Sequence, residues 1–562
     1  MAGQTAFPVI MRDGQDPRTA TGKPLLFGPE YAARVESGML IERNVQAPMR
    51  DGIRILIDIY RPAAGAVDAR LPAILCWSPY GKHGLSNQLW PAAGVNPDWL
   101  SPYTAFEAVD PVYWTARGYA VVYPDPRGTW LSPGEMSHGG KQESEDCYDL
   151  IEWLGDAEWC NGKVGMSGVS YLAVIQWQVA SLRPPHLAAL NPWEGFSDWY
   201  REFGRHGGIP ETDFCPNACG RLNWSTTRTE DTAANMAAHP LFDDYWRSKA
   251  MALEEIETPA LVVAGLADAG LHLRGSLEGF RRISSPQKWL DLHAGKKWAH
   301  YYHPQSVERL STFFDHFLKG QDTGIAAWPR VRLEVRETAT RSEIRAEAEW
   351  PLARTLHTPL YLDAATGGLE LAPAADAEVR YDAGSGEAVF EHAFAQDTEL
   401  TGYMSLHLWV ETEGADDMDL FVGIRKFDAA GREVPFIFYA FYEDGPAALG
   451  WLRASHRELD VAQSRPGQPV HSHLREERLV AGAPTLVDIE IWPSSTYFRA
   501  GERLRLVVTG HDLHQGGLPG TPFSRHQATR NQGVHILRTG GSHASHLLAP
   551  VVPPAARPQE EV

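Results

Sequence analysis

The chain has 562 residues, of which 43% are hydrophobic and 22% are charged, a composition typical of a folded globular protein. Asp and Glu outnumber Lys and Arg by 71 to 51, so the formal net charge is −20 at pH 7. Such a charge repels phosphate backbones, which argues against nucleic acid as a partner. No stretch approaches the roughly 18 uncharged apolar residues that span a bilayer, and the N-terminus lacks the pattern of a secretory signal. We therefore expect a cytoplasmic protein with no membrane partner.

The first half of the chain alternates strand-like and helix-like segments. Gly52–Arg61 alternates apolar and polar residues, as a half-buried strand does. Further strands are expected at Leu71–Trp77, Gly118–Tyr123, Lys163–Val169, His186–Asn191, Pro259–Gly265 and Lys288–Leu292, and helices at Glu143–Gly155, Tyr171–Leu182 and Val307–Lys319. This alternation predicts a parallel sheet covered by helices on both faces.

The strand pattern stops between two segments of the predicted sheet. Residues 193–253 are rich in Trp, Phe, Tyr and Arg and are typical of helices and loops. We interpret this segment as a helical cap inserted over the edge of the sheet. The predicted α/β core then comprises residues 1–192 and 254–327.

From residue 328 onward the pattern changes to alternation at period two, with Gly, Asp or Pro turns between the segments. Strands are expected at Val331–Val335, Pro359–Leu362, Leu406–Thr412, Asp419–Phe427, Leu486–Trp492 and Arg503–Thr509. Residues 328–562 are thus predicted to form an antiparallel β-sandwich. The tail Pro550–Val562, rich in Pro and Ala, is expected to be frayed.

The strongest local signal is Gly165–Ala173 (GMSGVSYLA), where a predicted strand passes into a helix. A serine at such a sharp turn projects its hydroxyl above the sheet, toward the helix N-terminus. The literal G-x-S-x-G pattern fails for both serines, because Val169 follows Ser167 and Leu172 follows Ser170 at the second-glycine position. We favour Ser170 as a nucleophile because it directly precedes the helix; an ordinary tight turn is the alternative.

A nucleophilic serine needs a base and an acid that orients the base, and in such sheets the chain order is Ser, then Asp or Glu, then His. Asp268 follows the predicted strand Pro259–Gly265, where a carboxylate would face the turn. His293 ends the next strand, and His300 lies in the loop that follows it. We predict Asp268 as the acid and His293 as the base, with His300 as the alternative.

Three further features bear on the site. Tyr80 follows a buried strand, where a sheet of this kind places a second oxyanion donor, although a turn aromatic is the alternative. Cys215 and Cys219 form a lone C-x3-C pair, for which free thiols or a local bridge outweigh a zinc site. No metalloprotease, phosphate-loop or dinucleotide motif is present, so no metal or organic cofactor is expected.

Several short motifs occur in a fixed order along the chain. They are Met49–Gly52 with Tyr60–Pro62, Ser78–Tyr80, Asp125–Gly128 with Ser132–Gly134, Glu145–Asp146 through Ile151–Leu154, Asn161–Met166, Gly168–Tyr171 and Phe313–Gly320. In these the chain resembles the cocaine esterase and α-amino acid ester hydrolase group, which is related to Xaa-Pro dipeptidyl-peptidases. The resemblance covers most of the chain.

The resemblance implies an α/β-hydrolase core, an inserted helical cap and a C-terminal jelly roll. It also implies that Ser170 is the nucleophile, that Asp268 is the acid, and that the Tyr80 hydroxyl and the Tyr171 amide form the oxyanion hole. The chain departs from the family at the base: Lys297 stands where relatives often have histidine. Relatives with a similar Lys-Trp pair tend to keep a histidine matching His293, which favours His293 over His300.

These observations predict a serine hydrolase that cleaves a carboxylic ester or amide of a small molecule through an acyl-enzyme. Two rivals stay open: a dipeptidyl-peptidase or aminopeptidase, which needs carboxylates such as Glu194 and Asp198 for a substrate ammonium, and a non-catalytic binding protein on the same fold. The aromatic residues at the start of the cap are as well suited to cap core as to an apolar substrate pocket; they are Trp193, Phe196, Trp199 and Tyr200. The sequence leaves the formation of a homo-oligomer open.

Overall fold

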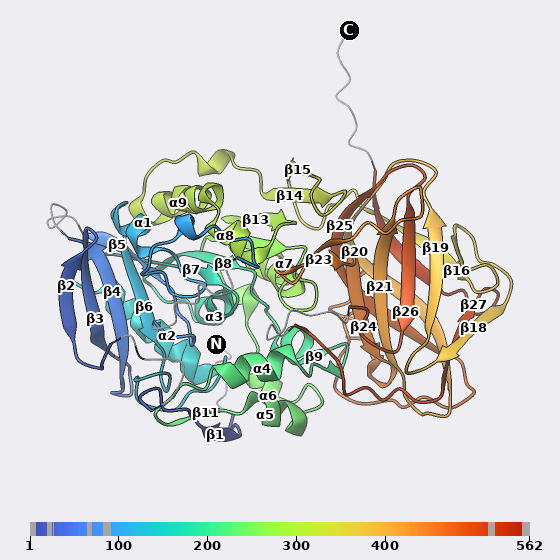
Figure 1. The fold of residues 1–562 in the computed structure, drawn as a ribbon, viewed down its shortest axis with the longest axis horizontal. Helices are drawn as coiled ribbons and strands as arrows, with labels where there is room; N and C mark the ends of the chain where they lie inside the picture. Colours follow the sequence, from blue (N-terminus) through green and yellow to red (C-terminus); the bar gives the residue numbers. More distant parts are fainter. Residues whose placement is uncertain are drawn as a thin grey trace, which may run out of the picture.

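The computed structural model describes residues 7–19, 25, 27–63, 70–82, 91–514 and 523–553. A mixed sheet with helices on both faces forms one half of the molecule, and strands of a β-sandwich form the other (Figure 1). The short helices α4, α5 and α6 lie along the lower side of the sheet half in this view.

The strand order of the mixed sheet is β2–β3–β4–β6–β5–β7–β8–β12–β13–β14–β15. Strands from β6 to β14 in this order run parallel, and antiparallel pairs close both ends. The strands are β2 (Ala32–Glu36), β3 (Met39–Pro48), β4 (Arg54–Pro62), β5 (Leu71–Leu75), β6 (Ala120–Asp125), β7 (Cys160–Val169), β8 (Leu187–Trp193), β12 (Ala260–Gly265), β13 (Lys288–His293), β14 (Val331–Arg336) and β15 (Ser342–Glu347).

Helices cover both faces of this sheet because its parallel strands are apolar on both sides. α2, α3 and α7 pack into one hydrophobic core, and α1, α8 and α9 pack into another. The helices are α1 (Pro111–Thr115), α2 (Lys141–Gly155), α3 (Tyr171–Ala180), α7 (Leu273–Arg282), α8 (Lys297–Tyr302) and α9 (Pro304–Lys319), with one-turn η1 (Pro97–Trp99) and η4 (Ile325–Ala327). The fold predicted from alternating strands and helices is confirmed, with element ends shifted by one to three residues.

The segment between β8 and β12 carries short elements. They are η2 (Trp199–Gly204), β9 (Arg205–His206), β10 (Ile209–Pro210), α4 (Phe214–Arg221), β11 (Arg228–Glu230), α5 (Thr232–Ala238), α6 (Asp244–Ser248) and η3 (Leu253–Glu255). β11 pairs antiparallel with β1 (Met11–Asp13) near the N-terminus. This segment therefore includes short strands that the expectation of helices and loops did not contain. The domain limits given above stay a prediction.

The C-terminal half is an antiparallel β-sandwich with its own hydrophobic core. The long strand β20 pairs with β25, β27 and β28, and β26 joins β19 to β21. The strands are β16 (Leu356–Asp363), β17 (Gly368–Glu370), β18 (Ala377–Asp382), β19 (Glu387–Ala393), β20 (Thr398–Glu413), β21 (Asp419–Phe427), β22 (Phe436–Phe438), β23 (Tyr442–Gly445), β24 (Ala448–Arg453), β25 (Thr485–Phe498), β26 (Arg503–Thr509), β27 (Val534–Thr539) and β28 (His546–Val552), with η5 (Ala454–His456).

The C-terminal tail corrects one expectation. Pro550 to Val552, predicted to be frayed, lie in β28, where the strand pairs with both β16 and β20. Backbone pairing on two sides outweighs the Pro- and Ala-rich composition. The rest of the predicted tail, from residue 554 onward, lies outside the described residues.

The cap segment meets the sandwich through a glycine hairpin between β9 and β10. Gly207 has φ +55°, and a Cβ there would lie 2.0 Å from the carbonyl oxygen of Trp451. The Gly207 carbonyl also accepts a hydrogen bond from the Arg453 amide at 2.8 Å. Only glycine permits this close approach of the two backbones.

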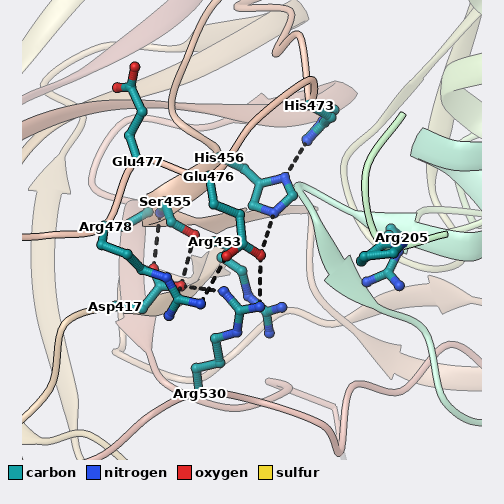
Figure 2. A network of polar contacts seen from close by, with 12 residues as sticks. Arg205, Asp417, Arg453, Ser455, His456, His473, Glu476, Glu477, Arg478 and Arg530 are labelled. Atoms are coloured by element: carbon teal, nitrogen blue, oxygen red, sulfur yellow. Dashed lines mark hydrogen bonds and ion pairs between the residues drawn. The ribbon is translucent and has the colours of Figure 1, made fainter. Parts of the chain in front are cut away.

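Next to this hairpin lies a network of charged side chains (Figure 2). Arg530 bridges Asp417 at 2.8 Å and Glu476 at 2.7 Å, and Glu476 lies 3.7 Å from His456. His456 in turn contacts His473 at 3.1 Å between their Nδ1 atoms. These ions and rings partner one another at the end of the sandwich that lies beside the β9–β10 hairpin.

Within the described residues, no helix is long and apolar enough to cross a bilayer. The five cysteines are all buried and unpaired, so Cys215 and Cys219 form no local bridge. The Cys215 thiol instead contacts the Met236 sulfur at 3.1 Å. The described part of the chain contains no group of three or more His, Cys, Asp or Glu side chains arranged to hold a metal ion.

Candidate active site

Ser170 occupies the sharp turn between β7 and α3. Its backbone has φ 61° and ψ −119°, a strained conformation for a residue with a side chain. Gly168 just before it has φ +149°, and a Cβ there would meet Leu172 at 2.5 Å. The turn therefore requires glycine and lifts the Ser170 side chain off the sheet.

The neighbouring serine has a different environment. The Ser167 hydroxyl lies 2.9 Å from Asn191 Oδ1 and 3.0 Å from the Tyr301 hydroxyl. Both contacts are buried and polar, which makes Ser167 part of the packing beneath the turn. Of the two serines considered from the sequence, the structure places Ser170 beside a histidine.

That histidine is His272, which directly precedes α7. Its Nε2 atom lies 3.2 Å from Ser170 Oγ, and its Nδ1 atom lies 2.5 Å from Asp268 Oδ2. Asp268 follows β12, so acid and histidine are four residues apart in one loop. Because an ionised carboxylate can only accept, the His272 Nδ1 must carry the proton, which leaves Nε2 as an acceptor facing the serine hydroxyl.

This arrangement corrects the predicted base. His293 Nε2 bonds to Glu194 Oε1 at 2.9 Å, and the His300 ring stacks on His293 with centroids 3.9 Å apart. Neither histidine is placed at Ser170. His293 does end a strand beside β12, as expected, but its side chain turns toward β8, whose following residue is Glu194.

Lys297 lies beside the acid and the histidine. Its Nζ atom is 2.6 Å from Asp268 Oδ2 and 3.0 Å from His272 Nδ1. Burial alone would raise the pKa of Asp268, but the Lys297 ammonium and the hydrogen bonds from Lys297 and His272 outweigh burial and hold that pKa below its ordinary value. Burial, reinforced by Lys297 and opposed by Asp268, lowers the pKa of His272 to about 4. At neutral pH the site therefore holds an ionised acid and an uncharged histidine.

Tyr80 reaches the same spot from the loop after β5. Its buried phenol has the Ser170 side chain, the Glu107 carboxyl and the Tyr171 backbone as polar neighbours. Burial and the nearby Glu107 raise the pKa of Tyr80 well above its usual range, which keeps the phenol protonated. A protonated phenol, which can donate a hydrogen bond, thus lies next to the serine.

The C-terminal half holds the loop that carries Asp268 and His272. The Tyr439 amide donates to the Ala267 carbonyl at 2.8 Å, and the Ser524 hydroxyl donates to the Gly270 carbonyl at 2.7 Å. These two contacts fix the loop on both sides of Asp268. The position of His272 therefore depends on the C-terminal half as well as on the mixed sheet.

The predicted substrate-contacting aromatics divide into two groups. Phe196 stacks on His272 with centroids 5.9 Å apart, and Trp199 packs edge-on against Phe196 at 4.9 Å. Trp193 instead packs against Tyr301 at 5.0 Å, within the core on the α8 and α9 face. Tyr200 packs against Trp246 inside the cap segment. Of these four side chains, Phe196 contacts the His272 ring and Trp199 packs against Phe196.

The two carboxylates considered for binding an ammonium group are already engaged. Glu194 is 1% exposed and bonded to His293, and burial raises its pKa well above the usual range. Asp198 accepts from two backbone amides at the start of η2 and pairs with Arg201 at 2.7 Å. Neither presents a free carboxylate to a substrate.

One feature of the sequence points to His272, namely its distance along the chain from Asp268. Lys297 stands where relatives often have the base, so a histidine must reach the serine from elsewhere. An acid and a histidine four residues apart, as in Asp268 and His272, can approach each other across one short turn. His272 was not among the histidines considered from the sequence.

Comparisons with known proteins agree with the fold. Residues 51–222 match the family model described as X-Pro dipeptidyl-peptidase (S15 family), and residues 323–548 match its C-terminal non-catalytic domain. A crystal structure of a CocE/NonD family hydrolase from Staphylococcus aureus superposes with a TM-score of 0.91 at 38% identity, covering 96% of this chain and 99% of that one.

Two further relatives are more distant. Cocaine esterase from Rhodococcus sp. (strain MB1 Bresler) is 30% identical over 394 residues, which span 58% of this chain and 63% of the esterase. An α-amino acid ester hydrolase structure shares 17% identity at a TM-score of 0.67, over 95% of this chain and all of that one, and so shares the fold.

An α/β-hydrolase sheet with a serine at the strand-to-helix turn, faced by a histidine and an aspartate, defines a serine hydrolase. The nearly full-length match between this chain and the staphylococcal hydrolase identifies the family within that class. The chain belongs to the CocE/NonD family of hydrolases, which confirms the resemblance seen in its motifs.

Proposed function

We propose that the protein hydrolyses carboxylic esters of small molecules, with Ser170 as nucleophile, His272 as general base and Asp268 as the orienting acid. The observation that carries this proposal is the unbroken chain of contacts from Ser170 Oγ through both ring nitrogens of His272 to Asp268. It is the geometry that activates a serine hydroxyl at neutral pH.

In the first half of the reaction, Ser170 Oγ attacks the substrate carbonyl carbon while its proton passes to His272 Nε2. The carbonyl oxygen gains a negative charge, which the Tyr80 hydroxyl and the Tyr171 N–H stabilise. The tetrahedral intermediate collapses, and His272 gives its proton to the departing alcohol. Water, deprotonated by the same ring, then hydrolyses the acyl-enzyme and restores Ser170.

Phe196 and Trp199 support an apolar or aromatic acyl group as the preferred substrate portion. Phe196 stacks on the His272 ring and Trp199 packs edge-on against Phe196, so an acyl group bound at Ser170 would lie beside an aromatic cluster. Since Glu194 and Asp198 are engaged elsewhere, an ester is favoured over a dipeptide with a free ammonium. Unpaired cysteines suit a reducing cytoplasm, which we keep as the proposed compartment.

The proposal is tested with two substrate classes in parallel. p-Nitrophenyl esters of acetate and of phenylacetate measure esterase activity, and Gly-Pro-p-nitroanilide measures dipeptidyl-peptidase activity. We expect ester turnover that is faster with phenylacetate and is abolished in Ser170→Ala. Faster turnover of the anilide would show the peptidase instead, and no turnover of any substrate by folded protein would favour a binding protein.

A further inference from the structure

Lys297 is buried against the triad of Ser170, His272 and Asp268. The mechanism proposed above assigns no role to this lysine. The Lys297 side chain is 8% exposed. Its ammonium contacts Asp268 Oδ2, the same oxygen that accepts a hydrogen bond from His272 Nδ1. Three atoms thus form a closed triangle. Lys297 Nζ lies 2.6 Å from Asp268 Oδ2 and 3.0 Å from His272 Nδ1, and His272 Nδ1 lies 2.5 Å from Asp268 Oδ2.

The other ionisable groups around this triangle do not cancel the ammonium charge at neutral pH. Burial raises the pKa of Glu107 to about 8 and that of Glu194 well above its usual range, so both carboxyls are largely protonated. Burial lowers the pKa of His293 to about 4, which leaves that ring neutral. Burial also raises the pKa values of the neighbouring phenols, so these stay uncharged; they are Tyr80 and Tyr439.

Asp268 is therefore the counter-ion of Lys297, and His272 is the group that feels both charges. An imidazolium on His272 would place its Nδ1–H beside a fixed ammonium only 3.0 Å away. The neutral ring avoids that repulsion and still donates to Asp268. The lysine also keeps Asp268 ionised, although the carboxyl groups of Glu107 and Glu194 lie near the same ammonium.

We propose that Lys297 is a positioning residue that keeps Asp268 ionised and His272 unprotonated in the resting enzyme, so that ester hydrolysis persists at acidic pH. The lysine begins α8, and the histidine that faces Ser170 lies in the loop after β12. This inference rests on the proposed function. A unit charge at this distance shifts the pKa of its neighbour by about 1 to 3 units.

The test compares Lys297→Met with Lys296→Met across the pH range. Methionine keeps the length of the lysine stem without its charge. Lys296 is the matched control because it adjoins Lys297 but pairs with Glu443 at 2.7 Å, away from the triad. kcat/KM for p-nitrophenyl acetate and the rate of fluorophosphonate labelling of Ser170 are both measured between pH 4 and pH 9.

For the wild type and Lys296→Met we expect the acid limb of both profiles well below the ordinary histidine value of about 6.5, toward pH 4. The sign follows from the base: activity needs the unprotonated ring and is lost as pH falls through the pKa of His272. Lys297→Met should move the limb upward by about one pH unit or more. Lys297→Arg, which keeps the charge, should leave the limb in place even where its kcat falls.

Two results would overturn the inference. One is a Lys297→Met profile whose acid limb coincides with that of the wild type after scaling. The other is a wild-type pH profile whose acid limb lies at about pH 6.5, the ordinary value for histidine. That result would overturn the inference even if Lys297→Met does not fold. Failure of the proposed function looks different, because then the wild-type serine is not labelled at any pH.

Discussion

The position of the base can be tested by a matched pair of substitutions, His272→Gln and His293→Gln. Both histidines are 1% exposed, and each bonds a carboxyl group through one ring nitrogen. Only His272 also contacts Ser170 Oγ, at 3.2 Å. Glutamine keeps a donor for the carboxyl partner but cannot accept and return a proton.

Loss of the triad histidine in a serine hydrolase lowers kcat by about 10⁶-fold, or about 8 kcal/mol in the activation free energy. We expect a loss of this order in His272→Gln and no detectable labelling of Ser170. His293→Gln should stay within about tenfold of the wild-type kcat, because it perturbs only the buried contact with Glu194. That contact is worth about 1 kcal/mol of stability, seen as a lower thermal midpoint.

The assay is hydrolysis of p-nitrophenyl acetate, with thermal unfolding of both variants as the check that each is folded. The reasoning is refuted if folded His272→Gln keeps its activity while His293→Gln loses it. The base would then be the histidine at the end of β13, and His272 would be only the first residue of a helix.

Three further predictions concern the groups around the triad. Tyr80→Phe should lower kcat by roughly 10² to 10³ with a smaller change in KM, since the phenol donates to charge that develops in the transition state; an unchanged kcat would make it a packing residue. Ser524→Ala should lower kcat by about tenfold without changing the pH profile, because the Gly270 carbonyl loses its donor and the His272 loop loosens; equal kcat in mutant and wild type would show that the loop holds itself. Phe196→Ala should reduce kcat/KM for phenylacetate more than for acetate, and an equal loss for both esters would place the acyl group elsewhere.

The architecture of this protein was accessible from its sequence because each pattern had a direct physical cause. Buried parallel strands such as β12 are short apolar runs, and period-two strands such as β20 and β26 have one face in the sandwich core. The first expected sandwich strand, Val331–Val335, instead lies in β14 and extends the mixed sheet beside β13. The turn at Ser170 was recognisable because a strand, a small-residue turn and an apolar helix follow one another without a gap. Asp268 and Tyr80 were found from their positions after strands, where parallel sheets gather functional side chains.

The histidine was not accessible in the same way. The rule used for the base assumes that acid and base follow successive strands, and His293 satisfies it. Whether a loop lets its own histidine fold back depends on contacts from residues far away in sequence, here Tyr439 and Ser524. Local patterns carry no information on such contacts. Lys297 indicated that the base differs from the expected pattern. Its partners became clear only from the fold, which brings Asp268 and His272 together.

The central claim, that Ser170 is an activated nucleophile, is tested most directly by covalent labelling with a fluorophosphonate followed by peptide mapping. The account predicts one phosphonyl group per wild-type chain, carried by the peptide that contains Ser170. Ser167→Ala should be labelled equally well, and Ser170→Ala should not be labelled at all. Folded wild-type protein that takes up no label, or takes it up at another residue, would contradict the account.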